Sequence, residues 1–175
     1  MDNNSNNRKP EAILESTSTL RSRSLAALTT VPTPVLIFAG VASILLAQYA
    51  ISICLGGVFG YPTPGLDPFA GRPLWLKILW VALFAPLYET FLFQWLIIKF
   101  LRGPLRRSWG VAGVVSTVVF GLGHGHTDWR AIRMLSTAAI LTSLFIIEAR
   151  RSGPAFRATF ATHALFNSLT IALSL

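Results

Sequence analysis

Four residues that could carry chemistry lie inside otherwise apolar stretches of the chain: Glu89, His124, His163 and Asn167. A carboxylate beside a neutral imidazole can act as a general base toward water. A second histidine and an amide can donate hydrogen bonds to a developing oxyanion. Ionisable groups at bilayer depth cost ~2.5–3.5 kcal/mol on insertion scales, so their presence there points to function. The set predicts hydrolysis of an amide bond by an activated water.

The spacing of these residues places them at a similar depth. Each lies 10 to 16 residues from the basic or polar end of its own apolar segment. That distance corresponds to about 15–24 Å along a helix that rises ~1.5 Å per residue. His163 and Asn167 are four residues apart and therefore share one helix face. Thr90 and Gln94 have the same spacing beside Glu89 and add hydrogen-bonding groups there.

Other reaction chemistries find less support in the sequence. No serine lies in a G-x-S-x-G elbow, and the single cysteine, Cys54, lies on a different apolar segment with no base nearby in sequence. One cysteine also excludes an intramolecular disulfide and a cysteine-built zinc site. A glutamate and two histidines can bind zinc, but the H-E-x-x-H spacing of such sites is absent. We therefore expect no cofactor, and the sequence does not support a metal site although it does not exclude a bound metal.

The composition indicates a membrane protein. Of the 175 residues, 53% are hydrophobic and only 13% are charged, whereas soluble domains carry about 25% charged residues. This balance excludes a water-soluble globule, and the apolar content excludes a disordered chain. The formal net charge of +8 is typical of positive membrane-flanking loops and need not indicate a nucleic-acid partner.

Long stretches without charge define the elements that must position the site. Between Lys77 and Lys99 the only charged residue is Glu89. Five apolar segments follow from such gaps, and a membrane-spanning helix needs ~20 residues. Their lengths and the lack of strict alternation exclude a membrane β-barrel. We expect an all-α, polytopic transmembrane bundle of about five spanning helices, over residues 34–59, 74–101, 109–123 (extending a little at both ends), 129–149 and 154–175.

The chain has room for one transmembrane domain, residues 34–175, after a disordered polar leader at residues 1–33. Eleven lysines and arginines lie in the leader and in or next to the loops after the second and fourth apolar segments. The other four lie in or next to the loops after the first and third segments. Because positive loops stay in the cytoplasm, this distribution predicts a cytoplasmic N-terminus and a C-terminus on the opposite side. An integral protein of a bacterial inner membrane fits this pattern.

The polar residues resemble the three ordered motifs of the CPBP family, which comprises CAAX proteases and bacteriocin-processing enzymes and is also called the Abi family. The family motifs are E-E-x-x-x-R preceded by a proline, F-x-x-x-H and H-x-x-x-N. The similarity covers roughly residue 74 to the C-terminus, with the CPBP-like core at about 74–175. The matching positions here are Pro86, Glu89, Thr90 and Gln94, then Phe120 and His124, then His163 and Asn167.

The resemblance implies an intramembrane glutamic-type endopeptidase. Glu89 and His124 would activate water, and His163 with Asn167 would form the oxyanion site. The implied partners are membrane lipid and a protein or peptide substrate. The family also acts on pheromone-like precursors and in bacteriocin self-immunity, so cleavage of CAAX sequences in particular is not implied.

Two positions depart from the family pattern, because Thr90 and Gln94 stand where it has a second glutamate and an arginine. They would support Glu89 by hydrogen bonds in place of a charge pair. Two other functions stay open. The chain could be a non-catalytic immunity or partner-binding protein that retains the motif residues as a polar network, because membrane Asn and His often serve only to join helices. A small transporter or proton relay would use the same buried glutamate and histidines.

Overall fold

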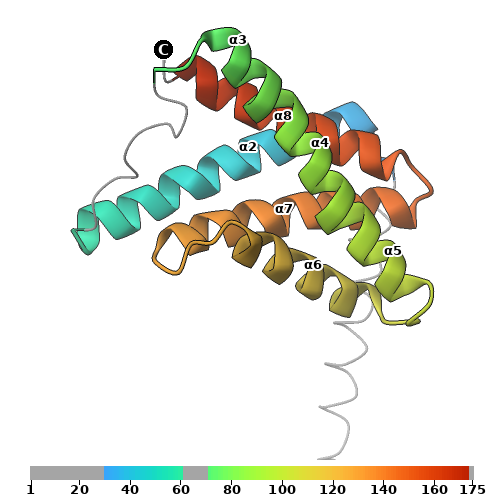
Figure 1. The fold of residues 1–175 in the computed structure, drawn as a ribbon. Helices are drawn as coiled ribbons and strands as arrows, with labels where there is room; N and C mark the ends of the chain where they lie inside the picture. The colour runs from blue at the N-terminus through green and yellow to red at the C-terminus, as the bar shows by residue number, and fades with distance from the viewer. Residues whose placement is uncertain (1–29, 61–70, 174–175) are drawn as a thin grey trace, which may run out of the picture. The chain divides into compact units, whose positions relative to one another are not determined.

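A computed structural model describes residues 30–60 and 71–173, and most of the predicted leader lies outside these ranges. Residues Thr33–Leu175 belong to one compact unit. All regular structure in the described ranges is helical (Figure 1), which confirms the all-α prediction. The elements are α2 (Thr33–Ser52), η1 (Ile53–Val58), α3 (Leu74–Lys77), η2 (Ile78–Phe84), α4 (Ala85–Glu89), η3 (Thr90–Leu96), α5 (Ile97–Arg102), α6 (Trp109–Gly123), α7 (Arg130–Arg150) and α8 (Ala155–Leu173), where η marks π-helical segments.

These elements form five continuous helices that match the five predicted segments to within two residues at each end. Three of the helices are long and apolar enough to cross a membrane: Thr33–Val58, Leu74–Arg102 and Arg130–Arg150. Helix α6 is apolar but has only 15 residues, and α8 carries His163 and Asn167 within its 19 residues. The chain is therefore a polytopic integral membrane protein.

We expected the third helix to extend a little beyond residues 109–123 at both ends, but it does not. Ser108 caps its beginning, because the Ser108 hydroxyl accepts a 3.2 Å hydrogen bond from the Val111 N–H. At the other end, His124 is the C-terminal cap, and Gly125 follows with a φ of +69°. A left-handed residue just beyond the cap commonly terminates a helix. The cap positions His124 at the end of a helix instead of within it.

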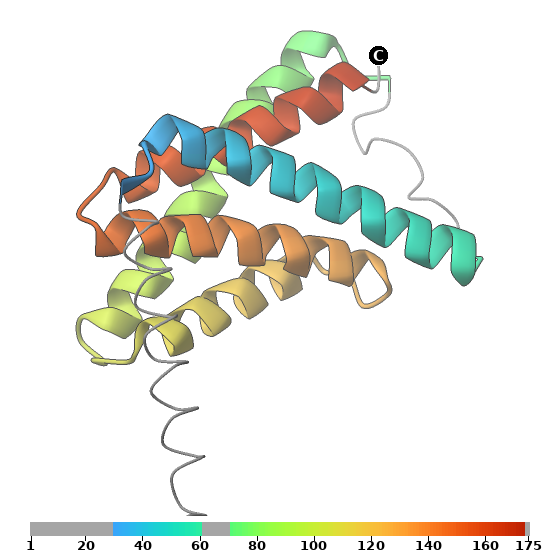
Figure 2. The ribbon, with the colours of Figure 1, turned by 180° about the vertical axis from the view of Figure 1, so that it is seen from behind.

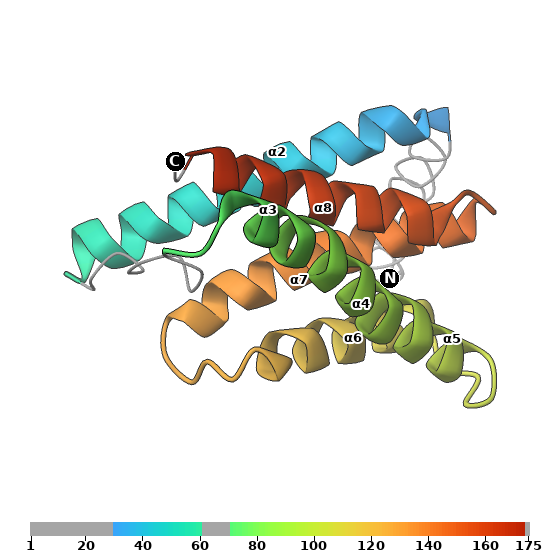
Figure 3. The same cartoon turned by 45° about the horizontal axis from the view of Figure 1, so that its top comes forward.

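Helix α7 lies at the centre of the bundle, packed against α2, α6 and α8 (Figure 2). The long helix Leu74–Arg102 crosses this group: η2 packs on α8, and α5 packs on α6 (Figure 3). A core of Ile44, Phe120, Ala138 and Leu141 joins α2, α6 and α7. Close packing of α6 and α7 depends on Gly121, because a Cβ there would lie 2.8 Å from the Cγ of Leu135.

Large apolar side chains cover the outside of the bundle. In water such a surface would promote aggregation, whereas in a bilayer it meets lipid chains. The outward-facing residues come from several of the helices and include Phe38, Leu46, Tyr49, Trp75, Val114, Leu122 and Leu173. The exposed apolar surface agrees with the membrane location that the sequence predicts.

Candidate active site

The structure brings Glu89 together with both motif histidines. Oxygen Oε1 of Glu89 lies 3.7 Å from Nε2 of His124, and Oε2 lies 3.6 Å from Nε2 of His163. The three residues come from α4, the end of α6 and α8, so three separate helices build the cluster. The Glu89 and His124 side chains are partly accessible, whereas that of His163 is almost fully buried. The sequence predicts these residues at a common depth with one imidazole beside the carboxylate, and the structure places a second imidazole beside it as well.

The ring of His124 is held in place by the helix that it caps. Its Nδ1 lies 2.9 Å from the carbonyl oxygen of Phe120, one turn earlier. In the neutral ring, Nδ1–H donates to this carbonyl, which leaves the Nε2 lone pair facing Glu89. The Phe120 ring packs on both His124 and His163, at centroid separations of 4.7 and 6.0 Å. Phe120 therefore fixes the two imidazoles in relation to each other.

Glu89 ends a short α-helical segment between two π-helical segments, η2 and η3. Short π-helical insertions are frequent at functional sites. Each segment offers a backbone carbonyl to a polar side chain of a neighbouring helix. Asn167 of α8 donates to Val81 at 2.8 Å, and Ser116 of α6 donates to Phe93 at 2.8 Å. The backbone that carries Glu89 is thus anchored on both sides by the helices that carry the two histidines.

Pro86 explains why the Val81 carbonyl accepts a hydrogen bond from the Asn167 side chain. The Ala85 N–H bonds the carbonyl of Trp80, five residues earlier. The next bond in that register would run from residue 86 to Val81, but proline has no N–H. The carbonyl of Val81 instead accepts the Asn167 amide. Asn167 therefore satisfies the acceptor that the motif proline leaves without a backbone donor.

Thr90 and Gln94 do not make the hydrogen bonds to Glu89 that we expected. Both side chains are fully buried. Thr90 Oγ1 and both amide atoms of Gln94 have no hydrogen-bond partner among the described residues. The physical reason is that the Glu89 carboxylate is directed toward the two histidines, one to each oxygen. Helix neighbours at positions 90 and 94 contribute buried polar groups behind the site without bonding the carboxylate.

A cavity of about 660 Å³ opens beside Glu89. Its walls are almost entirely aromatic and aliphatic, and among the described residues Glu89 is the only one with a carboxyl group that lines it. Such a cavity can take an apolar segment and present it to the carboxylate. The lining residues include Trp80, Phe84, Tyr88, Phe91 and Phe156.

His126 and Asp128 lie outside the cluster, in the connection between α6 and α7. The Asp128 carboxylate accepts hydrogen bonds from the Arg130 backbone N–H and guanidinium, both at 2.9 Å. The hydrogen bond from Arg130 holds the pKa of Asp128 below its ordinary value. These contacts fix the beginning of α7 and bring no further group to Glu89.

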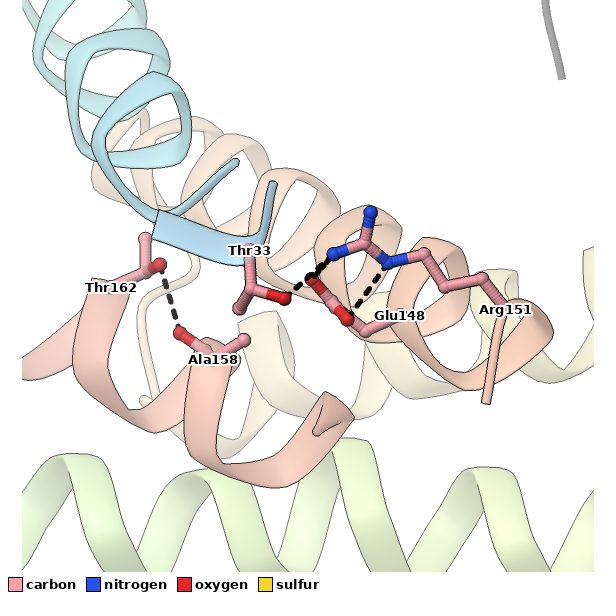
Figure 4. Close-up of polar contacts among 5 residues, drawn as sticks. All are labelled: Thr33, Glu148, Arg151, Ala158 and Thr162. Carbon is pink, nitrogen blue, oxygen red and sulfur yellow. Dashed lines mark hydrogen bonds and ion pairs between the residues drawn. The ribbon is translucent and has the colours of Figure 1, made fainter. Parts of the chain in front are cut away.

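Sequence reasoning missed two polar links between helices. Gln48 of α2 donates to Thr137 Oγ1 at 2.8 Å and to the carbonyl of Arg133 at 2.9 Å. Glu148 lies near the end of a predicted span, but its side chain is completely buried and accepts hydrogen bonds from Arg151, which also donates to the Thr33 hydroxyl of α2 (Figure 4). Its signal in the sequence is an acidic residue three positions before an arginine, the spacing of a helical ion pair.

No group of three or more His, Cys, Asp or Glu side chains that could hold a metal ion occurs in the described part of the chain. Nitrogen and oxygen ligands bind zinc at about 2.0–2.2 Å. At Glu89 a carboxylate is flanked by two imidazoles that can exchange protons with it.

The fold and the cluster together define a polytopic membrane protein with a Glu–His–His centre facing an apolar cavity. The family model described as type II CAAX prenyl endopeptidase Rce1-like matches residues 71–169, which is more than half of the chain. The chain belongs to this family, which confirms the resemblance drawn from the motifs. Neither curated proteins nor solved structures gave a match. The family identifies the chain as a CAAX-type intramembrane protease in general terms.

Proposed function

We propose that this protein is an intramembrane endopeptidase in which Glu89 activates a water molecule for attack on a peptide bond. The observation that carries the proposal is the placement of the Glu89 carboxylate 3.6–3.7 Å from two histidines, beside an apolar cavity. The family supports a protease in general, and the geometry suggests the role of each residue.

In the proposed reaction, a water molecule bound near Glu89 and His124 attacks the carbonyl carbon of the substrate. One water proton passes to the Glu89 carboxylate while the new C–O bond forms. The same proton then passes to the amide nitrogen as the C–N bond breaks, which gives a carboxylic acid and an amine. Positioned general bases of this kind contribute about 10²–10⁴-fold to a rate. His124 orients the water and stabilises the proton on Glu89.

His163 and Asn167 form the oxyanion site in this proposal. Nδ1 of His163 is buried without a hydrogen-bond partner among the described residues, which favours a neutral ring with its proton on Nε2. That N–H can donate to an oxyanion beside Glu89. A side-chain amide carries two N–H groups, and Asn167 uses one on Val81. The second can donate to the reacting carbonyl.

The proposal also covers the membrane in which the protein lies, its orientation there, and the class of its substrate. The eleven basic residues on one set of loops favour a cytoplasmic N-terminus and a bacterial inner membrane, with residues 1–33 as a polar leader and residues 34–175 as the single membrane domain. The apolar walls of the cavity favour a membrane-associated protein or peptide as the substrate.

We expect that Glu89→Gln abolishes proteolysis, because an amide cannot accept the water proton. The measurement compares new protein N-termini in membranes from cells with the wild type and with Glu89→Gln. Termini that occur only with the wild type would identify the substrates. Asp128→Asn is the matched control, since it removes an exposed carboxylate outside the cluster.

Identical sets of termini, with both proteins equally abundant, would contradict the proposal. A thermal-shift comparison in detergent then separates the remaining functions. If Glu89 belonged to a non-catalytic polar network, its replacement would lower the melting temperature. A proton relay or transporter would instead lose flux in proteoliposomes.

Pro86→Ala tests the link between Asn167 and the backbone that carries Glu89. The new N–H at position 86 can bond Val81 and compete with the Asn167 side chain. We expect cleavage of the identified substrates to fall about five- to tenfold, since one hydrogen bond contributes about 1 kcal/mol. Thermal stability should be unchanged or higher, because alanine favours a helix interior more than proline.

The control for this prediction is Pro104→Ala, in the exposed turn after α5. It should leave both cleavage and melting unchanged. A Pro86→Ala protein with wild-type cleavage would show that the Asn167–Val81 bond has no part in positioning Glu89.

A further inference from the structure

A second cavity, of about 370 Å³, lies away from the Glu89 cluster. We call it the basic pocket. It lies among the end of α5, the beginning of α6, the end of α7 and the beginning of α8. Three cations and four aromatic rings line it: Lys99, Arg102 and Arg157, with Trp95, Trp109, Phe145 and Phe156.

The charge of the basic pocket is not neutralised by its own walls. None of the described residues that line it is acidic. The Glu148 carboxylate lies against the lining residue Gly153, and it is already bonded by Arg151 at 2.6 and 3.0 Å. The pocket therefore offers three positive charges to a ligand. The beginning of α8 adds the positive end of a 19-residue helix.

Aromatic rings of the pocket hold two of these cations. Nζ of Lys99 lies 4.8 Å from the Trp95 ring centroid, and the guanidinium carbon of Arg102 lies 4.5 Å from that of Trp109. Ile98 and Phe145 also line the pocket, and both belong to a buried core cluster. Tryptophans and basic residues in this combination mark the level of lipid head groups.

We propose that the basic pocket binds an anionic phospholipid, with its phosphate among Lys99, Arg102 and Arg157 and its acyl chains against the apolar and aromatic lining. The polar groups of the lining side chains favour a lipid over a peptide as the ligand. All their polar groups are donors, and none is an acceptor. A peptide would bring N–H groups that these side chains cannot bond, whereas a phospholipid head group brings acceptors. The site lies on the side predicted to be cytoplasmic, where anionic lipids attract basic residues.

The basic pocket and the cavity beside Glu89 share one wall residue, Phe156. A lipid in the basic pocket would therefore contact the same ring that lines the substrate cavity. The assignment of a lipid site does not depend on the proposed cleavage, because binding can be measured on a protein with no proteolytic activity.

Native mass spectrometry of the full chain in detergent tests this assignment. Dioleoylphosphatidylglycerol is titrated against dioleoylphosphatidylcholine, which has the same acyl chains but no net charge. We expect at least tenfold tighter binding of the anionic lipid. Lys99→Gln with Arg102→Gln should weaken it roughly 20-fold, and Arg157→Gln roughly fivefold, with little change for phosphatidylcholine.

The matched control is Arg106→Gln with Arg107→Gln, which removes two exposed arginines that do not line the pocket. It should retain the preference for the anionic lipid. Arg157→Gln keeps the test valid if the α5 variant fails to fold, because Arg157 is exposed on α8.

Three results would overturn the assignment. Equal binding of the two lipids would show that charge has no part in it. Equal weakening by the control variant would assign the effect to general surface charge. Displacement of the lipid by millimolar inorganic phosphate, or by a short peptide with a free C-terminal carboxylate, would identify a soluble anion or a peptide as the occupant.

Discussion

His124→Ala is expected to abolish cleavage, with a loss of at least 10²-fold and up to about 10⁴-fold, the range that a positioned acid–base group contributes. The imidazole is held by the Phe120 carbonyl at 2.9 Å, and its Nε2 faces Glu89 at 3.7 Å. Without the ring, the water beside Glu89 loses the group that orients it. The measurement is the rate of cleavage of the substrates that the comparison of N-termini identifies.

The chain offers a matched control for this prediction in His126. It lies two residues away, in the same short connection to α7, but outside the cluster at Glu89. His126→Ala should leave the cleavage rate within twofold of the wild type. The melting temperature of both variants should remain near that of the wild type, because His124 is a partly exposed cap residue. Equal activity of the two variants would remove His124 from the mechanism.

The cluster at Glu89 could be predicted because polar residues inside apolar segments carry a free-energy cost, and such residues are easily recognised in the sequence. Glu89, His124 and His163 interrupt apolar segments, and polar groups at that depth need a partner. Their common level followed from helix rise alone, and the structure brings all three together. The contact between Asn167 and Val81 was not predictable, because it depends on a π-helical register that apolar periodicity does not reveal.

The fold was predictable for the same reason, since charge-free runs in a membrane protein have few alternatives to helices. Two details were not. The length of α6 is set by the Ser108 cap and by Gly125 with its positive φ, which end the helix inside an apolar run. The roles of Thr90 and Gln94 were misjudged, because sequence spacing gives the face of a residue but not the direction in which Glu89 turns.

The buried pair of Glu148 and Arg151 was also hidden from the sequence. Charged residues at the end of a span usually reach toward water, and Arg150 does so. Arg151 instead bonds the fully buried Glu148 and the Thr33 hydroxyl at 2.7 Å, and so joins the end of α7 to the beginning of α2 (Figure 4). Gly153 accommodates the pair, because a Cβ there would overlap the Glu148 carboxylate.

Arg151→Leu is therefore expected to be strongly destabilising, by about 3–5 kcal/mol, because it leaves a buried carboxylate without its partner. Arg150→Leu, at the neighbouring exposed position, should change stability by no more than about 0.5 kcal/mol. The measurement is the free energy of unfolding in detergent micelles. The double variant Glu148→Leu with Arg151→Leu should recover most of the loss, since apolar replacements of a buried ion pair are often tolerated. A double variant no more stable than Arg151→Leu would show that the arginine acts through Thr33 and helix α2, and that its pairing with Glu148 contributes little.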